Sequence, residues 1–162
     1  MQWYFLLGMA TGMRTMTGIA VVCWFGWLGL LPQQGWSLWL AHPVSVIVVT
    51  ILALGEYYVD TLPITPNRTD LPLLLARCVF GGFAGAMAAR ALIEPWAGGA
   101  LFALIGVFFG AFGGLRLRLW GARRVGRDLP VALSESALAI ALAILGAYML
   151  HRGMIYTSIA QS

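Results

Sequence analysis

The sequence predicts an all-α protein: a polytopic bundle of about five transmembrane helices that forms a single domain over residues 1–162. Hydrophobic residues make up 60% of the chain and charged residues only 10%, whereas a soluble domain carries about 25% charged residues. The apolar residues come in continuous runs, and a helix needs about 20 of them to cross a bilayer. The runs do not alternate apolar with polar residues, which disfavours a transmembrane β-barrel.

Five apolar runs are long enough to be spans. The first, residues 3–31, is long for one crossing and contains Arg14, so we expect a tilted helix or one broken near residues 12–18. Asp70 and Asp128 each precede a Leu-Pro pair. This pattern predicts helix starts, because a capping carboxylate accepts backbone N–H bonds and proline has no N–H to lose. The later spans and a short tail are expected at 43–60, 70–93, 97–119, 128–150 and 151–162.

The arginines predict an orientation. Half of the ten basic residues cluster around the connection between the last two runs: Arg116, Arg118, Arg123, Arg124 and Arg127. Positively charged connections stay in the cytoplasm, so counting five spans places the N-terminus inside and the C-terminus outside a bacterial inner membrane. The expected partners of these arginines are membrane lipids with anionic headgroups. No nucleic-acid partner is predicted, because no folded basic domain exists to bind one.

Rows of small residues predict close helix packing. Glycines recur every four residues in two of the runs, at Gly81 and Gly85 and at Gly106, Gly110 and Gly114. In lipid, such rows let helix backbones approach each other. Packing within one chain is the first interpretation. The alternative is a homo-oligomer interface that uses the row from Gly106 to Gly114.

The charges inside the apolar runs are the most informative feature: Arg14, Glu56, Asp60, Arg77 and Glu135. Each costs about 2.5–3.5 kcal/mol at the centre of a membrane helix, so we expect them to face inward and pair. Arg77 and Glu135 each follow a capping aspartate by about seven residues, which gives both a depth of about 10 Å. Two interpretations stay open. The set lines a polar pathway open to the cytoplasm, or it is an ion-pair network that fixes helix register.

A proline-rich connection follows the second run. Pro63, Pro66, Asn67 and Arg68 predict a rigid cytoplasmic turn. It is either a lid over the mouth of the polar pathway or a plain connector.

Two weak internal repeats conflict. Asp70–Arg77 resembles Asp128–Glu135, which relates helices of the same direction, and Leu7–Arg14 resembles Phe109–Arg116, which relates helices of opposite direction. One duplication cannot produce both. The inverted scheme is slightly favoured, because it aligns charged positions as well as glycines, as in inverted-repeat transporters.

Several short motifs carry a family resemblance: Gly12-Met13-Arg14-Thr15, Leu54-Gly55-Glu56 with Asp60, Pro66-Asn67-Arg68-Thr69, Ala76-Arg77 and Ala132–Glu135. Over most of its length the chain resembles an uncharacterised bacterial family catalogued as domain of unknown function 4126. The resemblance implies a multispan membrane protein with these charges as its signature, and it implies no activity. Ser136 stands where the family has an acidic residue, and Thr61 where a lysine is common.

No catalytic constellation is visible, so neither an enzyme, a cofactor nor a metal site is predicted. The leading hypothesis is a small inner-membrane transporter or channel for an unidentified small solute or ion, assembled as a homo-oligomer. Glu56 is its expected proton- or cation-binding carboxylate, with Arg14 as counter-ion or anion ligand. The alternative is a non-transporting scaffold or an anionic-lipid-binding protein.

Overall fold

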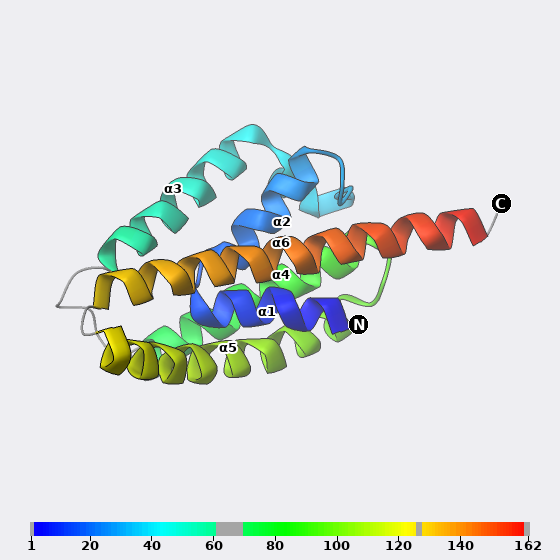
Figure 1. The fold of residues 1–162 in the computed structure, drawn as a ribbon. Helices are drawn as coiled ribbons and strands as arrows, with labels where there is room; N and C mark the ends of the chain where they lie inside the picture. Colours follow the sequence, from blue (N-terminus) through cyan, green and yellow to red (C-terminus); the bar gives the residue numbers. More distant parts are fainter. Residues whose placement is uncertain (1, 61–69, 126–127, 161–162) are drawn as a thin grey trace.

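The computed structural model describes residues 2–60, 70–125 and 128–160. In these ranges every regular element is a helix, which confirms the predicted all-α bundle (Figure 1). The elements are α1 (Gln2–Met13), α2 (Thr17–Trp27), the short 3-10 helix η1 (Gly35–Ala41), α3 (Pro43–Val59), α4 (Leu71–Ala91), α5 (Trp96–Val125) and α6 (Asp128–Ala160).

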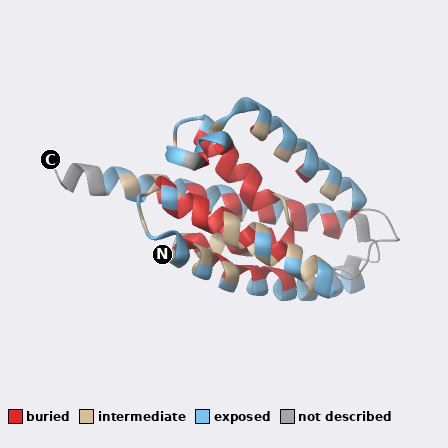
Figure 2. Cartoon of the chain, turned by 180° about the vertical axis from the view of Figure 1, so that it is seen from behind, coloured by how far each residue is buried: buried red, intermediate tan, exposed pale blue. Residues whose placement is uncertain are grey.

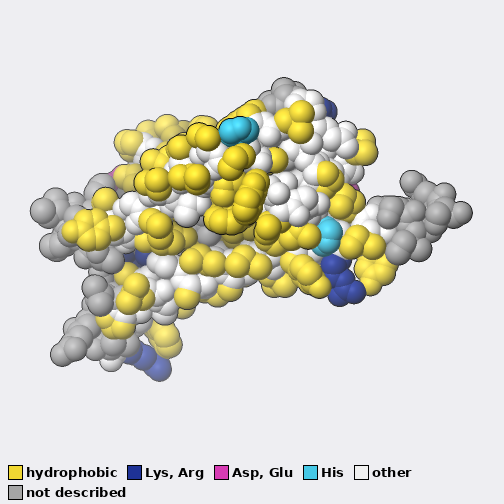
Figure 3. Space-filling model, turned by 90° about the horizontal axis from the view of Figure 1, so that it is seen from above, with side chains coloured by type: hydrophobic (Ala, Val, Ile, Leu, Met, Phe, Trp, Pro, Cys, Tyr) yellow, Lys and Arg dark blue, Asp and Glu magenta, His cyan; other side chains and the backbone are white. Residues whose placement is uncertain are grey.

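Length and surface together make this a membrane protein. Among the described residues, three helical stretches are long and apolar enough to cross a membrane: Leu71–Ala91, Trp96–Gly121 and Pro130–Tyr156. The face seen in Figure 3 is covered largely by hydrophobic side chains. Large apolar residues such as Ile51 and Phe109 are each 62% exposed. An exposed apolar surface of this extent suits lipid rather than water.

Helix α1 lies at the centre and packs against α4, α5 and α6. Its contact with α5 is backbone to backbone. A Cβ added at Gly8 or Gly12 of α1 would collide with main-chain atoms of α5, and one added at Gly106 or Gly110 of α5 would collide with main-chain atoms of α1. The α5 glycine row therefore packs within the chain. Gly85 does the same for the contact of α4 with α5, whereas Gly81 makes room for the side chain of Val107.

The first apolar run forms a helical hairpin. The chain leaves α1, turns at residues 14–16 and comes back in α2, so the two helices run in opposite directions (Figure 1). Gly18, just after the turn, packs against Leu7 and Thr11, just before it. Figure 2 shows that much of α1 and α2 is buried. A hairpin whose tip lies inside the bundle is the arrangement of a re-entrant segment.

The hairpin changes the expected topology. A break near residues 12–18 was expected, but within one crossing, with the termini on opposite sides. Instead both termini lie at one end of the bundle (Figures 1 and 2). At this termini end, the Tyr4 hydroxyl donates to the Glu94 carboxylate at 2.7 Å, which ties the start of α1 to the α4–α5 connection. The sequence locates the break, but helix periodicity contains no information on the direction of the chain after it.

Two helices extend beyond their predicted ends at 119 and 150. Helix α5 continues to Val125, so the arginines of its last turns lie on a helix rather than in a connection. Helix α6 continues to Ala160, and the expected tail is a helical extension, tied down where His151 Nδ1 meets the Leu30 carbonyl at 2.6 Å. Both extensions lack proline, the residue that breaks a helix most strongly. The sequence therefore contains no proline that would end either helix at its predicted boundary.

The predicted helix starts are at the expected places. Asp70 is the N-cap of α4 and Pro72 lies in its first turn, but the Asp70 side chain makes no capping hydrogen bond. Helix α6 begins at Asp128. The expected lid or connector at Pro63, Pro66, Asn67 and Arg68, together with Arg127, lies outside the described residues.

Candidate functional site

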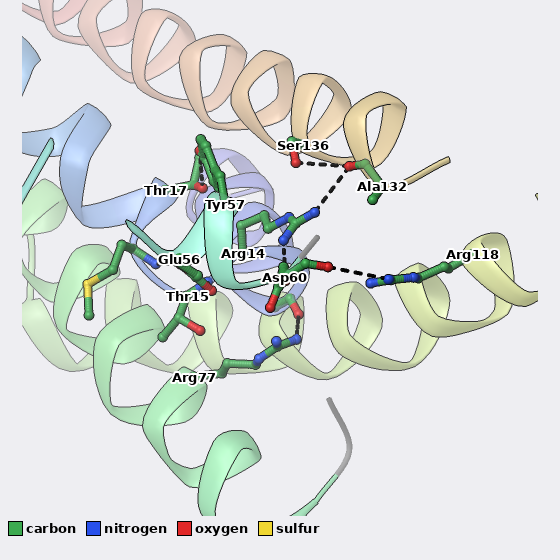
Figure 4. Close-up of polar contacts among 12 residues, drawn as sticks. Arg14, Thr15, Thr17, Glu56, Tyr57, Asp60, Arg77, Arg118, Ala132 and Ser136 are labelled. Carbon is green, nitrogen blue, oxygen red and sulfur yellow. Dashed lines mark hydrogen bonds and ion pairs between the residues drawn. The ribbon is translucent and has the colours of Figure 1, made fainter. Parts of the chain in front are cut away.

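The hairpin turn lies in a cluster of charged side chains, and Figure 4 shows those from α3, α4 and α5 around Arg14. We call these residues the tip cluster: Arg14 of the turn, Glu56 and Asp60 from the end of α3, Arg77 of α4, Arg118 of α5 and Glu135 of α6. Arg14, Arg77 and Glu135 are at most 2% exposed, and Asp60 is also buried. Glu56 is half-buried.

Glu56 binds the N-terminal end of α2. The N-cap residue Met16 provides no side-chain cap. Instead the Glu56 carboxylate accepts hydrogen bonds from the backbone amides of Thr15 at 2.6 Å and Met16 at 2.8 Å. These amides lie at the positive end of the helix dipole, where an anion is stabilised. A carboxylate from another helix thus fills an anion site that the break in the chain creates.

Arg77 meets the opposite helix end at the same break. Its Nη1 donates to the Gly12 carbonyl at 2.5 Å, in the last turn of α1. Carbonyls at a helix C-terminus have no partner within the helix and carry partial negative charge, so a cation stabilises them. The two half-helix ends are therefore matched by side chains of opposite sign, Arg77 for α1 and Glu56 for α2.

Arg14 connects the turn itself to α3 and α6. Its Nη1 forms a short ion pair with Asp60, the C-cap of α3, and its Nη2 donates to the Ala132 carbonyl of α6 at 3.1 Å. The guanidinium also lies 5.6 Å from the centre of the Tyr57 ring. Arg118 of α5 donates to the Asp60 carbonyl at 3.4 Å. A buried guanidinium with this many partners compensates for its lost hydration.

Glu135 occupies the space that a glycine leaves. A Cβ added at Gly114 of α5 would lie 2.9 Å from Oε1 of Glu135 and 3.3 Å from Cγ of Met13. Gly114 thus makes room for a carboxylate beside the end of α1, whereas Gly106 and Gly110 make room for backbone. Expected pairing between Arg77 and Glu135 stays a prediction.

The structure brings the five predicted intramembrane charges to one region, with partners that differ from the expected ones. Arg14 pairs with Asp60, and Glu56 bonds to backbone amides. Arg118, expected at lipid headgroups, belongs to the tip cluster. The other described arginines of that group, Arg116, Arg123 and Arg124, are exposed on α5, and Arg124 lies 4.4 Å from the Trp120 ring centre.

Sequence reasoning missed the neutral members of the site. Tyr57 shares a 2.8 Å hydrogen bond with Thr17 of α2 and faces Arg14. The Ala132 carbonyl, which also accepts from Ser136 at 2.9 Å, binds Arg14. The position of Tyr57 beside Glu56 was a usable signal. Backbone acceptors leave no signal in a sequence.

The tip cluster is balanced in formal charge, with three guanidinium groups against three carboxylates. Within the described residues, no three His, Cys, Asp or Glu side chains gather as a metal site requires. The groups that the site presents are a helix N-terminus and guanidinium groups, which bind anions, and a half-buried carboxylate, which binds cations or protons.

The fold and the tip cluster define the class: an all-α membrane protein with a helical hairpin whose charged tip is buried among the other helices. No family model, no curated protein and no solved structure matches the chain. Membership of the family catalogued as domain of unknown function 4126 stays a proposal.

Proposed function

We propose that this protein is a small ion transporter or channel whose ion site is the N-terminal end of α2 at the hairpin tip. One observation carries the proposal: both oxygens of the Glu56 carboxylate accept backbone amides there, at 2.6 and 2.8 Å. Discontinuous helices with ends that bind charged groups at membrane depth are typical of transporters. Glu56 holds the place of an ion in this conformation.

A small anion is the ion that fits the site. The two amides and the helix dipole favour negative charge. The cluster is neutral while Glu56 is ionised and in place, and it gains one net positive charge when Glu56 is neutralised or moves away. An anion that took over the amides of Thr15 and Met16 would restore the balance and lie close to Arg14.

The position of Glu56 on α3 supports exchange at this site. Helix α3 packs mainly on α2 and η1. Val46 and Ala53 are its buried residues, and its other residues are partly or largely exposed. In Figure 1, α3 lies at the edge of the bundle, away from α5. A small displacement of α3 would withdraw Glu56 from the turn without separating the central helices, whose backbones touch.

In the proposed membrane arrangement, α3, α4, α5 and α6 cross the bilayer and the hairpin enters from the termini end. The exposed Arg123 and Arg124 mark the opposite end, which we call the arginine end. The positive-inside rule places the arginine end in the cytoplasm of a bacterial inner membrane. The 12 residues of α1 reach about 18 Å from the termini end, slightly past the middle of a hydrocarbon core about 30 Å thick.

Anion flux through proteoliposomes tests the function. Glu56→Gln neutralises the side chain that occupies the site. We expect it to raise passive efflux of chloride or nitrate about tenfold over wild type, since a charge at a partly buried helix end is worth up to about 2 kcal/mol. Efflux is followed with an ion-selective electrode.

Glu94→Gln is the matched control, because Glu94 lies at the termini end and contacts Tyr4 rather than the tip cluster. It should leave the flux at the wild-type value. The proposal fails if folded wild-type protein and folded Glu56→Gln protein both release these anions no faster than empty liposomes do.

A further inference from the structure

A surface groove lies between α4 and α5, away from the tip cluster. It has a volume of about 510 Å³ and is lined by α4 from Val79 to Arg90 and by Trp96 and Ala100 of α5. Arg90 is the sole charged residue of the lining, and the other lining residues are apolar or glycine. Gly82 is part of the lining. A Cβ added there would make only ordinary van der Waals contact with Leu104, so the space beside this glycine is open.

Arg90 lies at the end of this groove with its charge available. The nearby acidic residue, Glu94, accepts a hydrogen bond from Tyr4. In the part of the chain that the structure describes, the exposed Arg90 guanidinium forms no ion pair. Trp96, 60% exposed, begins α5 beside it. Arginine and tryptophan side by side at a helix end are typical of the headgroup level of a bilayer.

The length of the groove matches one leaflet. The distance from Val79 to Arg90 along α4 is about 16 Å at 1.5 Å per residue, and half of the hydrocarbon core is about 15 Å thick. A chain that lies in the groove would therefore run from the headgroup level to the middle of the bilayer, with Arg90 at its polar end.

We infer that this groove binds one anionic phospholipid from the leaflet at the termini end. An acyl chain fills the apolar part along α4, and the phosphate pairs with the Arg90 guanidinium, whose planar donors suit phosphate oxygens. The charge complementarity with Arg90 and the one-leaflet length favour a lipid over a second copy of the chain.

Native mass spectrometry of the purified protein tests the charge half of this inference. The probes are phosphatidylglycerol and phosphatidylcholine with identical acyl chains. We expect wild type to retain phosphatidylglycerol about fivefold better, the value of one arginine near an anionic surface. Arg90→Gln should reduce retention of phosphatidylglycerol to that of phosphatidylcholine. Arg152→Gln, an exposed arginine near the same end, should keep the preference.

The steric half uses Gly82→Leu, which places a side chain in the groove. It should lower retention of both lipids, whereas Gly113→Leu, on an open face of α5, should lower neither. Circular dichroism checks the folding of each variant. If Gly82→Leu does not fold, the result for Arg90→Gln tests the inference on its own. The inference is overturned if Arg90→Gln keeps the preference, or if folded Gly82→Leu keeps its lipids. If Gly82→Leu loses a dimer peak but retains its lipids, the groove binds a second copy of the chain and the inference is overturned.

Discussion

Arg14 illustrates how a charge is kept inside a helical membrane protein. Its guanidinium is fully buried and contacts Asp60, a backbone carbonyl and an aromatic ring, each from α3 or α6. The partners come from helices far apart in sequence, so Arg14 connects the hairpin turn to both. Its contribution is therefore specific to this arrangement of helices.

The Arg14–Asp60 pair gives a testable prediction of stability. Removing one partner leaves the other charge buried, which costs about 3–5 kcal/mol. Arg14→Gln and Asp60→Asn should each lower the melting temperature of the detergent-solubilised protein strongly, and the double variant should lose much less than the sum of the two. Thermal unfolding of all four proteins measures this coupling. Additive losses would show that the two side chains do not depend on each other.

At the residue scale, the sequence identified the charged residues of the site but not the groups that they contact. Arg14, Glu56, Asp60, Arg77 and Glu135 were found because ionisable groups in apolar runs are costly. An estimate of depth from the number of residues after a helix start can only match one charged side chain with another. It could not find Glu56 on the amides of α2 or Arg77 on a carbonyl of α1, because those partners exist only once the helix breaks.

At the scale of elements, the hairpin depends on glycines that let α1 lie directly on α5. The two backbones meet at Gly8 and Gly12 on one side and at Gly106 and Gly110 on the other. This contact fixes α1 at the centre of the bundle. The ends of the two half-helices are then placed within reach of Glu56 and Arg77.

Gly110→Ala tests this contact. An added methyl group would press on the Met9 carbonyl, and overpacking of this kind costs about 1–3 kcal/mol. Gly113→Ala is its neighbour and control, because a Cβ there meets nothing within 4 Å. Thermal unfolding in detergent should show a clear loss for Gly110→Ala and none for Gly113→Ala. Equal behaviour of the two variants would contradict the packing of α1 on α5.

The sequence predicted the elements unevenly for physical reasons. Proline and a capping aspartate mark the starts of α4 and α6, and those starts are in place. The glycine rows correctly indicated close packing. Helix ends without proline, at the far ends of α5 and α6, were placed too early. The return of the chain after the break depends on tertiary contacts, which no local pattern contains.

At the scale of the whole molecule, the two ends of the bundle carry different groups. The termini end carries both chain termini, Glu94 and the Arg90 end of the groove between α4 and α5, and the arginine end carries the exposed arginines of α5. The tip cluster lies between them, nearer the arginine end, because Arg77 and Ala132 lie in the first turns of α4 and α6. The hairpin therefore leaves only a short distance between its tip and the arginine end.

The sidedness of three positions tests the hairpin most directly. In a background with Cys23→Ala and Cys78→Ala, single cysteines are introduced as Gln2→Cys, Gly153→Cys and Arg123→Cys, and sealed vesicles are treated with a membrane-impermeant maleimide. We expect the cysteines at positions 2 and 153 to react from the same side and the one at 123 only from the other. Labelling of positions 2 and 153 from opposite sides would mean that the first apolar run crosses the membrane, and would contradict the hairpin.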